Sequence, residues 1–283
     1  MPIRVRSFLT GLTASAAPAA AFFYERIRRN VHRSPTGPIS LLDYVDRAAF
    51  FAPHQLARLG TDYGGWLIPV EAGLTADTVC YCAGAGEDIS FECALVEHYP
   101  CSVWIIDPTP RALEHFKLLS EAVSAERPFP INNGRENYSI APRAFQRLHY
   151  LPVGLADRDT KLKFYLPRNP AHVSASAINL QQTEAYFRAS CERVSTIMRS
   201  QEHSEIGLLK MNIEGSEYGV IRDLVATRML PRLLLVEFDE AHTPIDAGAG
   251  RRIRRHIEML VSTGMRCIAV EGPKASFLRY FGP

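Results

Sequence analysis

The fold class of this chain can be inferred from one segment, Thr78-Val-Cys-Tyr-Cys-Ala-Gly-Ala-Gly-Glu-Asp-Ile-Ser-Phe91. Its first half is apolar at both alternating sets of positions, which predicts a strand buried on both faces of a parallel sheet. Gly84 and Gly86 then allow a sharp turn and leave no side chain between the backbone and a ligand. Asp88 follows as the expected N-cap of a helix. The stretch therefore predicts the strand, glycine turn and helix of a Rossmann-type unit.

An acidic residue follows the next expected strand, at 102–106. This residue, Asp107, lies about 20 positions after Gly86, the spacing at which a carboxylate meets a ribose hydroxyl in a Rossmann-type unit. Together the glycine turn and the carboxylate predict a pocket for a nucleoside.

The rest of the chain alternates apolar strands with amphipathic helices. Beyond the opening strand we expect strands at 102–106, 148–153, 206–211, 233–238, 267–270 and 276–281. This alternation predicts an α/β fold, a doubly wound, mostly parallel, seven-stranded Rossmann-like sheet with helices on both faces. The pattern of 161–166 predicts a hairpin arm, inside a polar insertion at about 160–204 where substrate-specific elements would lie.

A single domain is expected over residues 34–283, with a helical N-terminal segment at 34–75 and the Rossmann-like core at 76–283. Within the N-terminal segment, the apolar positions of 40–59 favour one or two helices interrupted by Pro53.

The segment Tyr63-Gly-Gly-Trp66-Leu-Ile-Pro69 predicts a turn followed by a short extended run. Two interpretations stay open. Trp66 is a core aromatic that closes the bottom of the domain, or the segment is a lid over the ligand.

Residues 1–33 differ in composition from the rest. Arg4 and Arg6 precede an uncharged, Ala-rich run at 7–24, and basic residues follow at 26–33. A signal peptide has the same order, but Ala, Ser and Thr make this run only weakly hydrophobic. We favour an N-terminal extension, flexible or membrane-proximal, and keep a basic amphipathic membrane anchor as the alternative.

The composition is that of an ordinary globular protein. Of the 283 residues, 47% are hydrophobic and 22% are charged, and the formal net charge is +2. Lys and Arg do not cluster with interleaved aromatics, so we expect no nucleic-acid partner. The 6 cysteines show no zinc-binding spacing, and we interpret them as small hydrophobic residues of a reduced, cytoplasmic chain. Membrane association through residues 1–33 is the alternative localisation.

Polar residues at the carboxyl ends of the expected strands form the functional shortlist, because open α/β sheets bind ligands at that edge. They are Gly84, Gly86, Glu87, Asp88, Asp107, Asn212, Glu214, Glu217, Glu237, Asp239 and His242. Each one alone is more often a cap or loop residue than a catalyst. Their occurrence at four successive strand ends favours a site.

Three motifs resemble those of FkbM-type methyltransferases, which belong to the class I S-adenosylmethionine-dependent group. They are Val79 to Phe91, Asp107-Pro-Thr-Pro110 and Leu209-Lys-Met-Asn-Ile-Glu-Gly-Ser-Glu-Tyr218. The resemblance covers roughly residues 60–240, and the Lys-x-x-x-Glu-Gly-x-Glu element is its most specific part.

The resemblance implies S-adenosylmethionine as cofactor. Gly84 and Gly86 would pass under its methionine end, and Asp107 would bind the ribose hydroxyls. Gly154 and Leu155 would lie near the adenine, with Asn212 and Glu214 close to the reactive methyl. The full expected cofactor-binding set is Gly84, Gly86, Glu87, Asp88, Asp107, Gly154, Leu155 and Asn212. Family members usually carry Asp where this chain has Asn212, so a negative charge is lost there.

The expected chemistry is metal-free methyl transfer to an oxygen of a small-molecule or glycan-like acceptor. The cofactor carries an activated methyl, so the protein must align the acceptor and exclude water. A general base helps if the acceptor is a hydroxyl, and Glu214, Glu237 and His242 are the candidates because Asn212 has no basic site. Asn212, Glu237, Asp239 and His242 would suit a divalent ion, an alternative that we do not favour.

Two other function classes stay open. A nicotinamide-dependent oxidoreductase shares the turn and the acidic residue, but Ile89 occupies the position where a dinucleotide fingerprint needs a small residue. A methyltransferase-like protein that binds a nucleoside or a partner without turnover is the second alternative, and Asn212 is the feature that supports it.

Overall fold

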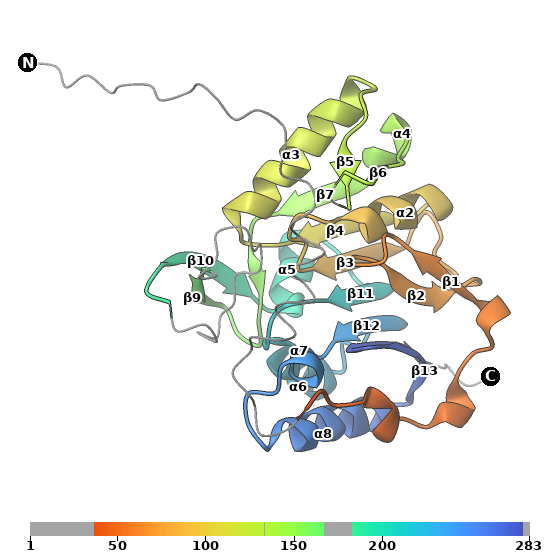
Figure 1. Cartoon of the computed structure of the whole chain (residues 1–283), viewed down its shortest axis with the longest axis vertical. Coiled ribbons are helices and arrows are strands. Elements are labelled where there is room, and N and C mark those ends of the chain that lie inside the picture. Colours follow the sequence, from red (N-terminus) through yellow and green to blue (C-terminus); the bar gives the residue numbers. More distant parts are fainter. Residues whose placement is uncertain (1–36, 133, 167–182, 280–283) are drawn as a thin grey trace, which may run out of the picture.

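The computed structural model describes residues 37–132, 134–166 and 183–279. Seven strands form one mixed sheet in the order β13-β14-β12-β11-β3-β4-β7 (Figure 1). Their bounds are β3 (Val79–Ala83), β4 (Ser102–Ile106), β7 (Leu148–Leu151), β11 (Leu208–Met211), β12 (Leu233–Glu237), β13 (Met265–Glu271) and β14 (Lys274–Arg279). The prediction of a seven-stranded, mostly parallel sheet is confirmed.

The direction in which the chain adds strands reverses between β3 and β11. From β3 the chain adds β4 and β7 on one side, and then returns to place β11 and β12 on the other side, all in parallel register. β14 runs antiparallel to both β12 and β13. The neighbouring carboxyl ends of β3 and β11 are therefore the topological switch point of the sheet, where open α/β sheets bind their ligands.

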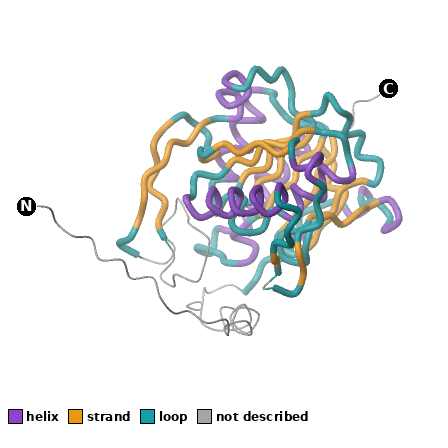
Figure 2. Tube along the Cα trace, turned by 90° about the horizontal axis from the view of Figure 1, so that it is seen from above, coloured by secondary structure: helices purple, strands orange, loops and turns teal. Residues whose placement is uncertain are grey.

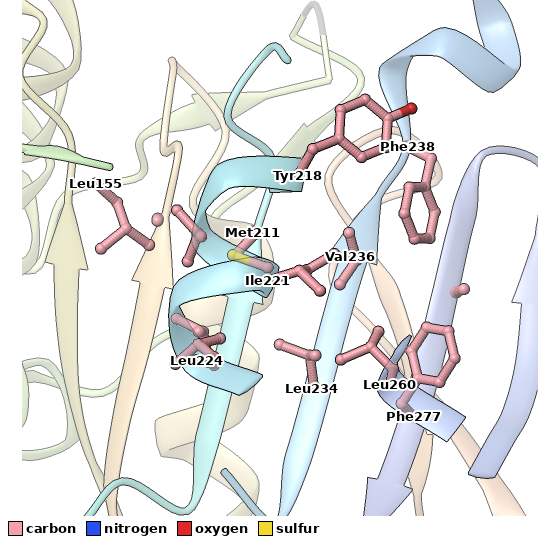
Figure 3. Close-up of a cluster of buried hydrophobic side chains, with 14 of the residues drawn as sticks. Leu155, Met211, Tyr218, Ile221, Leu224, Leu234, Val236, Phe238, Leu260 and Phe277 are labelled. Atoms are coloured by element: carbon pink, nitrogen blue, oxygen red, sulfur yellow. The ribbon is translucent and has the colours of Figure 1, made fainter. Parts of the chain in front are cut away.

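Helices cover both faces of the sheet, as expected for a doubly wound fold. One face carries α2 (Ser90–His98), α3 (Pro110–Ser124) and α4 (Pro142–Phe145). The other face carries α5 (Val194–Ser200), α6 (Glu217–Thr227), α7 (Asp239–His242) and α8 (Ala249–Ser262). Figure 3 shows the core on this second face, where Ile221 and Leu224 of α6 pack on β11 and β12.

Alternation along β3 supplies side chains to both cores. Tyr81 and Ala83 belong to the core under α5 and α6, whereas Cys80 and Cys82 belong to the core under α2 and α3. Both sets are buried, which is why the strand is apolar at every position. All six cysteines are free and buried, as small hydrophobic residues would be.

A smaller sheet follows β7 in the order β8-β10-β9, formed by β8 (Gly154–Leu155), β9 (Thr160–Tyr165) and β10 (Tyr186–Glu192). All of β9 pairs antiparallel with β10, from Tyr186 to Cys191, so the predicted hairpin arm is confirmed. Figures 1 and 2 show this arm at the left, standing away from the large sheet. A further short hairpin is formed by β5 (Pro130–Ile131) and β6 (Glu136–Asn137).

The described part of the N-terminal segment differs from the helical prediction. It contains single 3-10 turns, η1 (Leu41–Asp43), η2 (Arg47–Ala49) and η3 (Pro53–Gln55), and then a hairpin of β1 (Leu56–Leu59) and β2 (Trp66–Pro69). Pro53 is the first residue of η3, and a strand follows that turn directly. Its apolar residues pack against the domain through single turns and strands, so helical spacing was misleading.

The extended run at β2 and the turn before it are confirmed. Trp66 and Ile68 are fully buried in the core under α2, which favours the core-aromatic interpretation over the lid. The expected extension at 1–33 lies outside the described residues. In the part of the chain that the structure describes, no helix is both long and apolar enough to cross a membrane.

Candidate functional site

Gly84 and Asn212 meet at the switch point. They directly follow the last residues of β3 and β11, Ala83 and Met211, which are paired in the sheet. The Asn212 amide donates to the Ala83 carbonyl at 3.0 Å, and the Gly84 amide donates to the Ile106 carbonyl at 3.0 Å. The hydrogen bonds of the sheet thus continue one residue beyond β3 and β11, and they hold the first residue of the glycine turn in place.

Only glycine fits at position 84. A Cβ atom there would lie 1.7 Å from the carbonyl oxygen of Asn212, and the backbone has a φ of +80°. Gly86 also has a positive φ, of 55°. The predicted sharp turn is therefore confirmed, and the missing side chain of Gly84 makes room for the Asn212 carbonyl. Close approach of a ligand to the two glycines stays a prediction.

A buried ion pair holds the turn from below. The Lys210 ammonium donates to the Gly84 carbonyl at 2.7 Å and to the Glu92 carboxylate at 3.1 Å. Its side chain is 4% exposed and that of Glu92 is 0% exposed. Burial lowers the pKa of Lys210, but the neighbouring Glu92 carboxylate outweighs this effect, so the pKa is raised. Lys210 is therefore charged and links β11, α2 and the turn.

No specific role for Lys210 follows from the sequence, although it begins the most specific motif. The feature of the sequence that could have pointed to Lys210 is its place as the one charged residue in the strand Leu208-Leu-Lys-Met211. A lysine in a strand buried on both faces requires a buried partner. The sequence does not show that the partner is Glu92 on α2.

Asp107 is bonded to the turn on one side and to its own loop on the other. One carboxylate oxygen accepts the amides of Ala85 at 2.8 Å and Gly86 at 3.2 Å. The other accepts the amide of Thr109 at 2.8 Å and its hydroxyl at 2.6 Å. Asp107 is thus buried and shapes the turn, while its contact with a ribose stays a prediction.

Asp88 and Glu87 already have protein partners. Asp88 accepts the amide of Ser90, the first residue of α2, at 2.9 Å and the hydroxyl of Thr61 at 2.6 Å. It therefore caps the helix, although Ile89 occupies the N-cap position itself. Glu87 forms a two-point ion pair with Arg111 at 3.0 and 2.9 Å, partly exposed to solvent. Their contact with a cofactor stays a prediction.

Gly154 and Leu155 lie in β8 and are buried. A Cβ on Gly154 would lie 2.6 Å from the sulfur of Cys191 on β10, so packing of the small sheet accounts for this glycine. Leu155 belongs to the core shown in Figure 3, together with Met211 and Tyr218. No contact of these two residues identifies an adenine pocket, and their role stays a prediction.

Four acidic residues at the ends of β11 and β12 interact electrostatically with one another. We call this group, Glu214, Glu217, Glu237 and Asp239, the carboxylate cluster. Buried oxygens of Glu217, Glu237 and Asp239 have no hydrogen-bond partner among the described residues. Burial and the neighbouring acids Glu214, Glu217 and Glu237 raise the pKa of Asp239 well above its usual range. Asp239 therefore binds a proton more tightly than an exposed aspartate does.

Burial is the main cause of the raised pKa values of Glu217 and Glu237 in the carboxylate cluster. Burial raises the pKa of Glu217 from 4.5 to about 7, and the acids Glu214 and Glu240 add to the effect. Burial also raises the pKa of Glu237, although Lys274 beside it on β14 opposes the shift. Both carboxyl groups therefore exchange a proton closer to neutral pH than an exposed glutamate does.

His242, the third candidate base, lies at the end of α7 and is exposed. It interacts electrostatically with the carboxyl of Glu237, so the structure brings these two candidate bases near each other. Within the residues described, no three His, Cys, Asp or Glu side chains are arranged to hold a metal ion.

The sheet order and the fixed glycine turn at its switch point define a methyltransferase-like α/β fold. The particular family follows from the sequence, because residues 83–262 match the model of the methyltransferase FkbM domain. The chain belongs to this family, and the resemblance inferred from its motifs is confirmed.

Among solved structures, the chain is similar to methyltransferase FkbM from Methylobacillus flagellatus KT. The two share 13% sequence identity with a TM-score of 0.39, over 72% of this chain and 44% of that chain. This chain thus corresponds to less than half of that protein. No curated protein sequence matches.

Proposed function

We propose that the protein is an S-adenosylmethionine-dependent methyltransferase that methylates an oxygen of a small-molecule or glycan-like acceptor. The observation that carries the proposal is the glycine turn at the switch point, which packs without a side chain against Asn212 and is held by Lys210. A family domain that matches residues 83–262 supports the same activity.

The cofactor supplies the activated methyl group, and the chain supplies position. Gly84 and Gly86 let the backbone approach the methionine end closely, while Asp107 holds the amides of Ala85 and Gly86 in one orientation. A turn that is already ordered loses little entropy on binding and aligns the methyl with its acceptor.

The base that we propose for a hydroxyl acceptor is Glu237, at the carboxyl end of β12. Burial raises its pKa, so it is a stronger base than an exposed glutamate, and one of its buried oxygens has no partner among the described residues. Glu214 and His242 are the alternatives. Asn212 cannot accept the proton, so it serves as a hydrogen-bonding group at most.

A protein without turnover is the second candidate, and Asn212 favours it because the family usually has an acid at this position. A nicotinamide-dependent oxidoreductase is less well supported. Ile89 is fully buried at the start of α2, where a dinucleotide fingerprint needs a small residue for close helix packing.

The test is calorimetry of the protein against S-adenosylmethionine, S-adenosylhomocysteine and NAD, followed by transfer of an isotope-labelled methyl to a panel of hydroxyl acceptors. We expect binding of the first two ligands and transfer that Glu237→Gln lowers by about 10²–10⁴-fold. Glu258→Gln, an exposed change on α8, is the matched control. Absence of binding by both sulfur ligands would refute the proposal, and binding without any transfer would favour the second candidate.

A further inference from the structure

The hairpin arm formed by β9 and β10 presents one basic and aromatic face. Directly opposed residues of an antiparallel pair point to the same side, and every second residue joins them. The register pairs Tyr165 with Tyr186, Lys163 with Arg188 and Lys161 with Ser190. We call these six residues the arm face. It carries three cations and two tyrosines.

The two faces of the arm differ in chemistry. On the opposite side, Phe164 and Phe187 stack with ring centroids 5.4 Å apart, and Leu162 pairs with Ala189. The apolar side thus holds the hairpin together. The arm face is open to solvent, since Lys161, Arg188 and Ser190 are exposed and Tyr186 is 45% exposed.

The cations of the arm face form no ion pair with acids of the described chain. Lys163 stands directly opposite Arg188, an arrangement of like charges that destabilises a sheet. None of the ion pairs among the described residues involves Lys161, Lys163 or Arg188. The nearest acids along β10 are Glu184 and Glu192, before and after the strand's paired residues. Each lies four residues from Arg188, roughly 13 Å along an extended strand.

A cation–π contact orders the centre of this face. The Lys163 ammonium lies 4.3 Å from the centroid of the Tyr186 ring, and the rings of Tyr165 and Tyr186 lie 6.1 Å apart in a tilted arrangement. Such contacts hold the cation and the rings in fixed positions. They contain no acidic group, so the three cations remain available to pair with an anion.

The arm starts at the edge of the sheet that carries the candidate site. β7 ends at Leu151 and β8 begins at Gly154, and the Leu151 carbonyl accepts the amide of Asp107 at 3.2 Å. Because Asp107 also binds the glycine turn, the root of the arm is close to that turn. Figure 1 shows the arm projecting from this end of the molecule.

We propose that the arm face binds the acceptor, and that the acceptor is an anionic glycan. Its carboxylate, sulfate or phosphate groups would pair with Lys161, Lys163 and Arg188, and its sugar rings would pack on Tyr165 and Tyr186. Complementary charge gives the specificity, and the tyrosines provide amphipathic contact area at low entropic cost. This inference rests on the proposed methyltransferase function, because it names the substrate class of the same site.

The test measures binding of the full chain to dextran sulfate, neutral dextran and phosphatidylserine-containing vesicles at about 0.15 M salt, where long-range attraction is screened. We expect binding of dextran sulfate alone. Lys163→Glu/Arg188→Glu should weaken it by at least about tenfold, and Tyr186→Ser should weaken it as well. Lys117→Glu/Arg143→Glu, two exposed sites on α3 and α4 with the same change in net charge, is the matched control.

Failure of this inference and failure of the proposed function are distinguishable. Binding of S-adenosylhomocysteine is measured on the same samples, and the arm variants should keep it. If the unmodified chain does not bind dextran sulfate, or if the control variant loses as much binding as the arm variant, the arm proposal is wrong. Preferential binding of vesicles would overturn it in favour of a lipid surface. Should the charge reversal unfold the chain, Lys163→Gln/Arg188→Gln provides the same comparison.

Discussion

Replacing Lys210 by Met is expected to destabilise the protein strongly, because it leaves the Glu92 carboxylate alone inside the core. Glu92 is 0% exposed, and its second oxygen has no partner among the described residues even with Lys210 present. Removing one partner of a buried ion pair costs about 3–5 kcal/mol. A domain of ordinary stability has only about 5–15 kcal/mol to lose.

A double variant distinguishes the energetic contribution of the ion pair from the effect of side-chain packing. In Lys210→Met/Glu92→Met both charges disappear together, and apolar side chains of similar length fill the space. Such replacements are often neutral or stabilising. We therefore expect the double variant to be more stable than Lys210→Met alone, with an interaction energy of about 2–3 kcal/mol in the cycle.

The assay is equilibrium unfolding in urea, with S-adenosylhomocysteine binding measured on each folded variant. Arg111→Met/Glu87→Met is the control cycle, because that ion pair is 47% and 36% exposed and should couple by at most about 1 kcal/mol. The reasoning is refuted if Lys210→Met costs less than about 1 kcal/mol, or if the two substitutions are additive. The double variant should still bind the ligand more weakly, since nothing then holds the Gly84 carbonyl.

Three further predictions concern the same edge of the sheet. Gly84→Ala places a methyl 1.7 Å from the Asn212 carbonyl, so we expect calorimetry to show no ligand binding, whereas Gly134→Ala, where a Cβ meets nothing within 4 Å, should bind normally. Asp107→Ala should weaken cofactor binding by about 1–3 kcal/mol, and unchanged affinity would remove Asp107 from the site. The raised pKa of Glu217, from 4.5 to about 7, means that the folded state binds the proton more tightly, so stability should fall as pH rises through this window. Glu217→Gln should flatten the pH dependence of unfolding and stabilise the protein at pH 8 by about 1–3 kcal/mol; an unchanged profile would show that Glu217 does not titrate in this way.

The fold could be predicted from the sequence where local pattern and burial agree. The strand at 79–83 is apolar on both alternations because helices cover both of its faces. The prediction of helices at 40–59 is wrong for the described residues, since the same apolar positions fit single 3-10 turns and a strand. Over so short a stretch, periodicity does not separate these forms.

For the candidate site, the sequence predicts which residues lie at the carboxyl ends of strands, but not which of them contact one another. Gly84 was recognisable because its conformational requirement is local. The hydrogen bonds from the Ala85 and Gly86 amides to Asp107 and the pairing of Lys210 with Glu92 join segments far apart in the chain. Their geometry depends on which strands are neighbours, and spacing along one chain does not give that information.

The turn itself does not depend on the side chain at position 212. Gly84 packs against the backbone carbonyl of Asn212, and the Asn212 amide continues the sheet. An acid or an amide at this position would leave those backbone contacts unchanged, so the departure from the family pattern is a change in chemistry and not in architecture. The negative charge missing at position 212 must then be weighed against Glu237 and Asp239 at the neighbouring strand end, where burial raises the pKa of both carboxyl groups. We therefore expect methyl transfer to depend on those acids, because the backbone contacts at position 212 form without a charged side chain there.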